Sequence, residues 1–240
     1  LMDGKSIHEL MEMEGVTISA GVPTVWMMLL GYLKESGKKF SSMKRTVIGG
    51  SAAPRSMIET FRNDYNVDVL HAWGMTETSP LGTACHLKKK HAGLSEEEIV
   101  TLSLKQGRAV YGVEMKIVGA NGEPLPWDGK ACGNLLVRGP WISSNYFKGE
   151  GGSAVNADGW FDTGDVSTID EDGYMQITDR DKDVIKSGGE WISSIDVENE
   201  TVGVPGIAEA AVIAVYHPKW DERPLVIAVK EPGSDVGKQD

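Results

Sequence analysis

The first third of the chain alternates between two patterns of hydrophobic and polar positions. Short apolar runs with the length of strands lie at 16–20, 45–48 and 67–73. Segments with apolar residues at helical spacing lie at 6–14, 23–38 and 54–65. The last two begin with Pro, which suits the first turn of a helix, and Ser6 with Glu9 has the spacing of a capping box. Repeated strand and helix patterns with short connections predict a mostly parallel sheet covered by helices.

The rest of the chain changes character twice. Residues 87–106 are polar and charged, which is typical of a solvated surface insertion with one helix. From there to Ile177, short strands are separated by the turn sequences Asn121-Gly122, Asp158-Gly159 and Asp172-Gly173. This order predicts a small antiparallel, β-barrel-like unit. After the charged segment 179–186, one helix at 194–201 and two strand-like runs predict the start of a small α+β unit.

The expected fold is therefore α/β, as the C-terminal portion of a large domain followed by an incomplete small domain. The large domain would span 1–180, with an α/β part at 1–105 and a β-rich part at 106–180. The small α+β domain would begin at 181 and be truncated at 240. Leu1 starts in mid-pattern without an initiator Met, and Asp240 follows a strand-like segment, so both ends look cut.

Composition narrows the function classes. The 240 residues are 40% hydrophobic and carry a formal net charge of -11, which argues against a protein that coats nucleic acid. The two cysteines, Cys85 and Cys132, form no Cys-x-x-Cys pair, and reduced cysteines predict a cytoplasmic protein. No apolar run is long enough to span a bilayer. The sequence leaves peripheral membrane contact and a homodimer open.

One polar motif follows the strand at 67–73. Trp73 can stack on a base, and Gly74 lets the backbone approach a ligand. Thr76 can donate to a phosphate oxygen, and Glu77 can help to hold Mg²⁺, which prefers oxygen ligands and phosphates. Ligands bind beyond the carboxyl ends of such strands, but residue types alone leave an ordinary strand-to-loop turn equally open.

Two further motifs carry weaker signals. Asp165, at the end of a Gly-flanked turn, can accept hydrogen bonds from a ribose diol, although alone a turn residue that bonds its own backbone is the better interpretation. Arg180, in the charged segment, can reach a ribose or phosphate, and the segment itself suits an exposed hinge or an ordinary surface linker. The Gly49-Gly50 turn between a strand and a helix suits a polar ligand but is common. His71 borders the first motif and is also typical of a core histidine.

In this order, the motifs resemble those of the adenylate-forming superfamily of acyl-CoA synthetases, peptide-synthetase adenylation domains and luciferases. The matching segments are Trp73–Glu77 (where Tyr is usual at the first position), Trp160–Asp165, Asp179–Asp183 and Ser187–Glu190. The resemblance covers essentially the whole chain. Gly21–Thr24, the insertion at 87–108 and Lys186–Ser194 look closest to the medium- and long-chain fatty-acyl-CoA synthetases.

The resemblance implies a two-step reaction, in which ATP activates a carboxylic acid to an acyl-adenylate and CoA then accepts the acyl group, with release of AMP. Thr76 and Glu77 would act on phosphate and Mg²⁺, and the small domain would rotate about Lys182. The implied nucleotide site contains Gly50, Ser51, Ala52, Ala72, Trp73, Gly74, Met75, Thr76, Asp165 and Arg180. The implied acyl pocket contains Val22, Gly49 and His71. The implied pantetheine contacts are Gly188, Gly189, Glu190 and Trp191.

Two motifs of the superfamily have no match in this sequence, namely the phosphate loop with its lysine and the lysine that contacts the reacting carboxylate. We expect truncation to explain both, so that the parent protein is a ligase and the isolated fragment is inactive. Two alternatives remain: an adenylating enzyme with an acceptor other than CoA, and a non-catalytic remnant that binds a nucleotide or acyl-adenylate.

Overall fold

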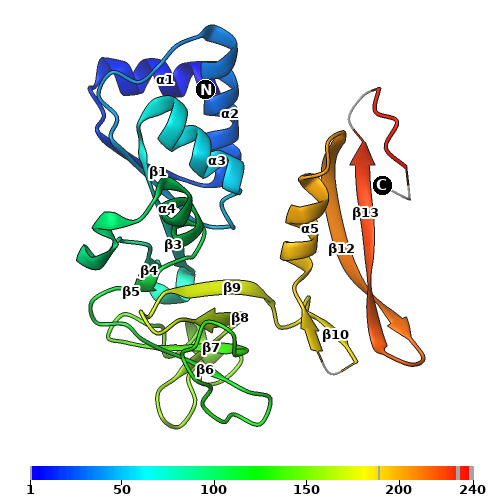
Figure 1. The fold of residues 1–240 in the computed structure, drawn as a ribbon. Helices are drawn as coiled ribbons and strands as arrows, with labels where there is room; N and C mark the ends of the chain where they lie inside the picture. Colours follow the sequence, from blue (N-terminus) through cyan, green and yellow to red (C-terminus); the bar gives the residue numbers. More distant parts are fainter. Residues whose placement is uncertain (1, 189, 231–232, 238–240) are drawn as a thin grey trace. The chain divides into compact units, whose positions relative to one another are not determined.

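The computed structural model describes residues 2–188, 190–230 and 233–237 (Figure 1). Contacts within the chain divide it into two compact units. The first unit contains Leu1–Met115, Val137–Phe161 and Glu171–Gln176. The second contains Lys116–Leu136, Asp162–Asp170 and Ile177–Asp240. The domain boundary predicted between residues 180 and 181 stays a prediction.

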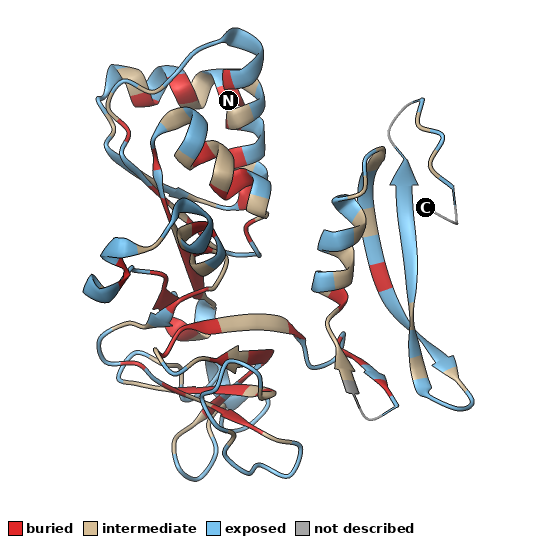
Figure 2. Ribbon diagram, viewed as in Figure 1, coloured by how far each residue is buried: buried red, intermediate tan, exposed pale blue. Residues whose placement is uncertain are grey.

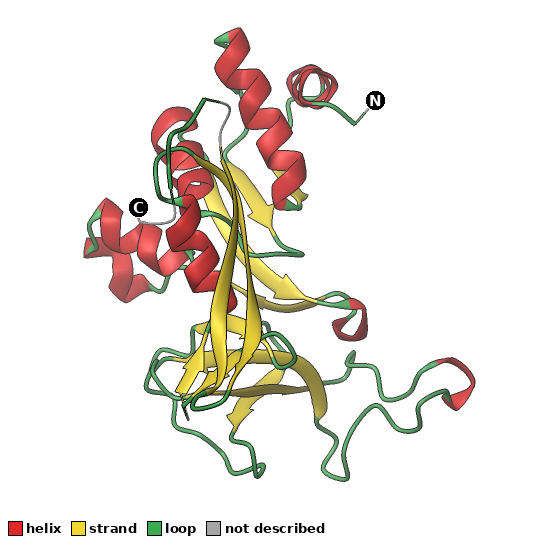
Figure 3. Ribbon diagram, turned by 90° about the vertical axis from the view of Figure 1, so that its right-hand side faces the viewer, coloured by secondary structure: helices red, strands yellow, loops and turns green. Residues whose placement is uncertain are grey.

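A five-stranded sheet with the order β1-β2-β3-β4-β5 forms the centre of the first unit. Its strands are β1 (Ile18–Gly21), β2 (Arg45–Ile48), β3 (Asp68–Gly74), β4 (Leu81–Ala84) and β5 (Arg108–Ala109). The first three pair in parallel, with Val47 opposite both Ala20 and Leu70. β4 pairs antiparallel with both β3 and β5. Figure 3 shows the helices and strands of the chain in separate colours. The predicted α/β fold is confirmed, and two unpredicted antiparallel strands extend the sheet on the β3 side.

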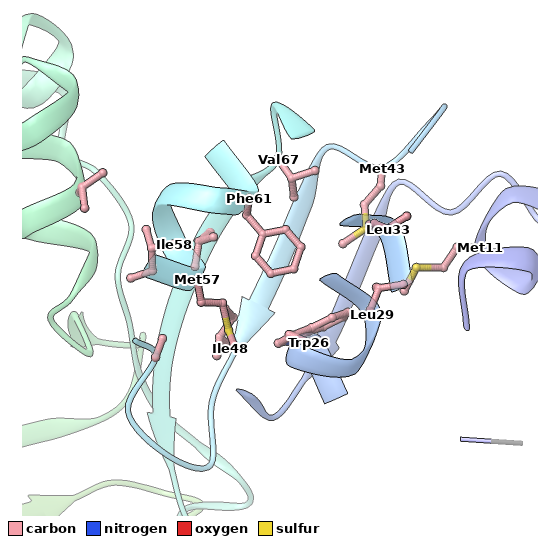
Figure 4. Packing of buried hydrophobic residues seen from close by; sticks show 13 residues of the cluster. Met11, Trp26, Leu29, Leu33, Met43, Ile48, Met57, Ile58, Phe61 and Val67 are labelled. Atoms are coloured by element: carbon pink, nitrogen blue, oxygen red, sulfur yellow. The ribbon is translucent and has the colours of Figure 1, made fainter. Parts of the chain in front are cut away.

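Helices pack on this sheet through one apolar core. They are α1 (Gly4–Met13), α2 (Pro23–Ser36) and α3 (Arg55–Glu59), which continues as a π-helical turn (Thr60–Asp64). Trp26 of α2 meets Phe61 edge to face at 5.8 Å between ring centroids, and both are buried beside Ile48 (Figure 4). Such a cluster supplies the apolar burial that holds helices on a sheet.

The cap of the first helix differs from the sequence prediction. Asp3, rather than Ser6, precedes α1, and its Oδ1 accepts the Ser6 backbone N–H at 2.8 Å. The Ser6 hydroxyl donates to the other carboxylate oxygen at 2.9 Å. Asp and Ser are both good capping residues, and a carboxylate at this position satisfies an otherwise unpaired N–H while complementing the helix dipole.

The polar insertion contains the expected helix and is tied to a distant turn of the same unit. A 3-10 turn (Lys89–Gly93) precedes α4 (Glu96–Ser103), and Ser95 caps that helix in a capping box with Glu98. Asp172 accepts hydrogen bonds from Lys90 at 2.6 Å and from Lys88 at 3.0 Å. These contacts lower the pKa of Asp172 to about 2. The charged residues of the insertion therefore bond to the turn of residues 171–174.

A four-stranded sheet with the order β6-β7-β8-β9 follows in the chain. Its strands are β6 (Glu114–Val118), β7 (Cys132–Arg138), β8 (Phe161–Ile169) and β9 (Met175–Arg180). Each strand begins in one unit and ends in the other. Asp165 was expected at the end of a tight turn, but it lies within β8, where Gly164 alone has a positive φ of 68°.

The last part of the second unit is a sheet with the order β11-β10-β13-β12 and one helix. Its elements are β10 (Ile185–Ser187), β11 (Glu190–Ile192), α5 (Ser194–Val202), β12 (Ile207–His217) and β13 (Asp221–Lys230). Ser193 caps α5, because its hydroxyl accepts the Asp196 N–H at 3.1 Å. Most of β13 is exposed (Figure 2).

Among the residues that the structure describes, no helix has the length and apolar character needed to cross a membrane.

Candidate functional site

The end of β3 carries the first predicted motif. Ala72 and Trp73 are buried, and the Trp73 ring lies so close to Gly82 of β4 that a Cβ there would overlap it. Gly74 allows a still closer approach, since an added Cβ would overlap the Pro80 carbonyl oxygen. This close packing fixes the conformation at the end of β3, directly before the loop that contains Thr76 and Glu77.

An apolar cavity of about 310 Å³ lies beside this strand end. Its lining residues are Ala20, Gly21, Val22, Val47, Gly49, Gly50, Ala72, Trp73, Gly74, Pro80 and Leu81. Gly50 has a φ of +84°, and a Cβ there would be 3.0 Å from Val22 Cγ1. The structure thus brings six predicted site residues to one cavity: Val22, Gly49, Gly50, Ala72, Trp73 and Gly74. Small residues along its wall leave room for an apolar group.

His71, predicted for the acyl pocket, does not line this cavity. Its Nε2 accepts the Ala53 N–H at 3.3 Å, which leaves Nδ1 as the donor to the Leu104 carbonyl at 2.9 Å. Burial lowers the pKa of His71, so the ring is neutral at pH 7. The imidazole joins the loop after β2 to the insertion, while Ser51 and Ala52 of that loop are exposed. The roles of His71, Ser51 and Ala52 in substrate binding stay predictions.

The loop after β3 forms a short 3-10 helix, Thr76–Thr78. Thr76 is exposed, Glu77 is half-buried, and the buried Thr78 hydroxyl accepts the Met75 N–H at 2.9 Å. Oε1 of Glu77 accepts a hydrogen bond from the Tyr146 hydroxyl at 2.9 Å. Thr78 ends the motif recognised in the sequence, which assigned it no role. Tyr146 was not anticipated, because nothing local relates it to a residue so far away in the chain.

The donor chemistry of this loop suits one kind of cation. The described residues include no group of three or more His, Cys, Asp or Glu side chains that could hold a metal ion. A single half-buried carboxylate, that of Glu77, is what Mg²⁺ uses when it keeps several waters and is shared with substrate phosphates. The residues present therefore fit a Mg²⁺ ion that arrives with a nucleotide.

The second unit contains the other predicted nucleotide contacts. Arg180 Nε lies 2.9 Å from Asp165 Oδ1, and the Asp165 side chain is only 3% exposed while that of Arg180 is 52% exposed. Arg180 also donates to the Thr163 carbonyl at 3.4 Å, and the Asp165 N–H donates to the Thr163 hydroxyl at 3.1 Å. The two residues predicted to hold a ribose are thus direct neighbours, with a buried anion held by a partly exposed cation.

The predicted hinge lies in the turn between β9 and β10. Lys182 is exposed there, and the neighbouring Asp181 N–H donates to the Gly164 carbonyl at 3.0 Å. Asp179, to which the sequence analysis assigned no particular role, is 2% exposed. Its carboxylate accepts hydrogen bonds from the N–H groups of Arg180 at 2.8 Å and Ser194 at 2.6 Å. A buried carboxylate therefore joins the end of β9 to the start of α5.

The predicted pantetheine contacts lie around the β10–β11 turn. Gly188 has a φ of +61°, and a Cβ there would be 2.7 Å from the Trp220 ring. Lys186 Nζ lies 5.5 Å from the centroid of the Trp191 ring, a cation–π distance. Gly189 and the side chain of Glu190 lie outside the described residues. The role of this turn in CoA binding stays a prediction.

Comparison with known proteins defines the class. The chain belongs to the AMP-binding enzyme family, which matches residues 1–147. It is 53% identical to a medium-chain-fatty-acid–CoA ligase of Ectopseudomonas oleovorans, over 98% of this chain and 43% of that protein. It is equally similar, 53% over 98% of this chain and 43% of the relative, to a 3-methylmercaptopropionyl-CoA ligase of Ruegeria lacuscaerulensis.

A solved structure shows the same fold. The amide bond synthetase McbA from Marinactinospora thermotolerans superposes with a TM-score of 0.83 at 28% sequence identity, over 99% of this chain and 46% of that chain. The 240 residues thus span less than half the length of these relatives.

Proposed function

We propose that the protein containing this chain is an acid–thiol ligase, which activates a carboxylic acid with ATP and transfers the acyl group to CoA. The observation that carries the proposal is the apolar cavity at the end of β3, directly before Thr76 and Glu77. An apolar wall suits the acyl part of an acid, while a hydroxyl and a carboxylate suit phosphates and their cation.

In the first step, a carboxylate oxygen of the acid attacks the α-phosphorus of ATP, and the bond to pyrophosphate breaks. The residues of this chain position the reactants and form no covalent bond with them. Thr76 would donate its hydroxyl hydrogen to a phosphate oxygen, and Glu77 would bind Mg²⁺. When bound, Mg²⁺ neutralises charge on the phosphates of the departing pyrophosphate. Gly50, Ser51 and Ala52 would border the adenine and acyl sites, and Trp73 and Met75 would contact the nucleotide.

Asp165 and Arg180 would hold the ribose in both steps. A buried carboxylate accepts strongly from a hydroxyl pair, and the adjacent guanidinium, 2.9 Å away, pairs with that carboxylate and orients it. Because Asp165 is itself part of strand β8, its position is set by sheet hydrogen bonds rather than by a flexible loop.

In the second step, the CoA thiolate attacks the carbonyl carbon of the acyl-adenylate, and AMP leaves with the electrons of the broken C–O bond. Rotation about the exposed turn at Lys182 would bring the β10–β11 turn to the acyl-adenylate. Gly188, Gly189, Glu190 and Trp191 would then contact the pantetheine. The positive φ of Gly188 supports a backbone that can approach a narrow ligand closely.

The acid is proposed to be a medium- or long-chain fatty acid. Similarity to the medium-chain-fatty-acid–CoA ligase supports this, although the equally similar 3-methylmercaptopropionyl-CoA ligase is named for a shorter acid. Val22 and Gly49 line the apolar cavity that would take the acyl end, and His71 would fix the adjoining loop. Cytoplasmic location, peripheral membrane contact and a homodimer remain predictions from the sequence.

One alternative has a specific observation in its favour. The structural similarity to an amide bond synthetase supports an acceptor other than CoA. A panel assay of the full-length protein separates the two, with Mg-ATP, CoA and acids from short to long chain. Equal amounts of AMP and acyl-CoA support the ligase, whereas AMP or acyl-adenylate without thioester supports another acceptor. If no acid gives a product, the result would support a non-catalytic remnant that binds a nucleotide.

A further inference from the structure

A loop far along the chain forms three hydrogen bonds with Glu77 and Ser79. The Ser143 N–H donates to the Glu77 carbonyl oxygen at 2.8 Å, and the Ser79 hydroxyl donates to the Trp141 carbonyl at 2.9 Å. The third contact is between side chains, from the Tyr146 hydroxyl to Oε1 of Glu77 at 2.9 Å. The first two contacts each involve a backbone carbonyl and hold the two loops together. The third holds the Glu77 carboxylate, which would bind a cation.

The direction of the third hydrogen bond is settled by chemistry. A carboxylate can only accept, so the phenol must donate. The phenol hydroxyl therefore holds one oxygen of the carboxylate, Oε1 of Glu77.

The other carboxylate oxygen, Oε2 of Glu77, has no hydrogen bond to any described part of the chain. A half-buried glutamate without a side-chain partner would sample several rotamers, and ordering it on cation binding would oppose that binding. Holding Oε1 in place removes part of this cost and presents Oε2 in a fixed direction. Groups that bond to metal ligands in this way tune metal affinity even though they never touch the metal.

We propose that Tyr146 is a positioning residue, which orients Glu77 for the divalent cation of the bound nucleotide. This inference rests on the proposed function to the extent that it needs a nucleotide-bound cation at Glu77. It adds to that function a residue 69 positions away from Glu77 in the sequence.

A purely structural role explains the tyrosine less well. The side chain is 46% exposed, so its burial contributes little to packing. The loop is already held by the Ser143–Glu77 backbone contact and by the Ala154 N–H, which donates to the Ser144 carbonyl at 3.0 Å. Replacing Tyr146 by Phe would keep the ring and these backbone bonds, and would remove only the hydroxyl that reaches Glu77.

The test uses the full-length protein with Tyr146→Phe and, as a matched control, Tyr111→Phe. Tyr111 is 98% exposed and loses the same hydroxyl away from Glu77. Electron paramagnetic resonance would measure the affinity for Mn²⁺ in the presence of a non-hydrolysable ATP analogue. We expect roughly 10- to 100-fold weaker Mn²⁺ binding in Tyr146→Phe and no change in the control. We also expect the Mg²⁺ concentration for half-maximal activity to rise, with most of the rate recovered at saturating Mg²⁺.

A double-mutant cycle with Glu77→Gln separates positioning from general damage to the loop. If Tyr146 acts through Glu77, its substitution has little further effect on Mn²⁺ affinity in the Glu77→Gln background. Two results for Tyr146→Phe would overturn the proposal: an equal loss of Mn²⁺ affinity in both backgrounds, or an affinity equal to that of the wild type. The proposal would also fail if the wild-type protein bound no Mn²⁺ in the presence of the analogue. Wild-type protein that binds Mn²⁺ and analogue but makes no acyl-CoA would contradict only the proposed function.

Discussion

Arg180 and Asp165 form an ion pair in which the carboxylate is buried and the guanidinium is half exposed, with 2.9 Å between Nε and Oδ1. The pair comes from neighbouring strands, β8 and β9, that the turn at 170–174 connects. A carboxylate taken out of water needs such a partner to stay ionised, and an ionised carboxylate is what a ribose diol requires.

Replacing Arg180 by Gln should weaken both nucleotide binding and folding. We expect AMP affinity to fall about tenfold, which corresponds to about 1.4 kcal/mol. The free energy of unfolding should also fall, by up to about 3 kcal/mol, because the buried Asp165 carboxylate loses its cation. Calorimetric titration of AMP and urea unfolding measure the two quantities. Arg138→Gln breaks an exposed pair with Glu114, at 2.7 Å, and should leave AMP affinity unchanged. Equal losses of affinity in both variants would contradict the assigned role.

Gly50→Ala tests the wall of the cavity. The left-handed backbone at Gly50 makes alanine unfavourable by roughly 1–2 kcal/mol, and the new Cβ would meet Val22 Cγ1 at 3.0 Å. Gly15→Ala is the matched control, because Gly15 also has a positive φ, of 60°, with open space around it. Both variants should unfold at lower temperature, but only Gly50→Ala should raise the KM for the acid. An unchanged KM would remove this residue from the acyl site.

His71 should make stability depend on pH. Burial lowers its pKa below the ordinary value of 6.5, so the unfolded chain binds a proton more readily than the folded one. The neutral, buried His71 contributes fully to the free energy of unfolding above pH 6.5. As the pH falls below 6.5, that free energy should decrease by up to about 1.4 kcal/mol per pH unit. Urea unfolding at pH 7.5 and 5.5 measures this. His71→Gln should be less stable at pH 7.5 and show a smaller difference between the two pH values. The same difference in both proteins would contradict the prediction.

Asp179 should be a stability residue of the second unit. Asp179→Ala leaves the N–H groups of Arg180 and Ser194 without their carboxylate acceptor, which costs about 1–3 kcal/mol for each one that stays buried. Thermal unfolding should show a lower midpoint for this variant. Asp183→Ala, at an exposed position of the following turn, serves as the control. Equal midpoints for the two variants would show that the Asp179 contacts contribute nothing.

Local patterns predicted the elements of the first unit well, and long-range contacts account for most of what was missed. The strand at 45–48 was placed at its observed bounds, because a short apolar run next to a Gly turn has few alternatives. The glycines around Asp165 favoured a turn, yet pairing with neighbouring strands keeps 161–169 extended. The contact between Tyr146 and Glu77 has no local signal, because it depends on how a loop folds back on the sheet.

Formation of an acyl-adenylate by the parent protein can be measured directly. Exchange of labelled pyrophosphate into ATP, measured with the full-length protein and no CoA, tests this step by itself. We expect exchange that requires both a carboxylic acid and Mg²⁺, with fatty acids of medium or long chain the most effective. No acid-dependent exchange, or release of ADP and phosphate in place of AMP and pyrophosphate, would contradict this expectation.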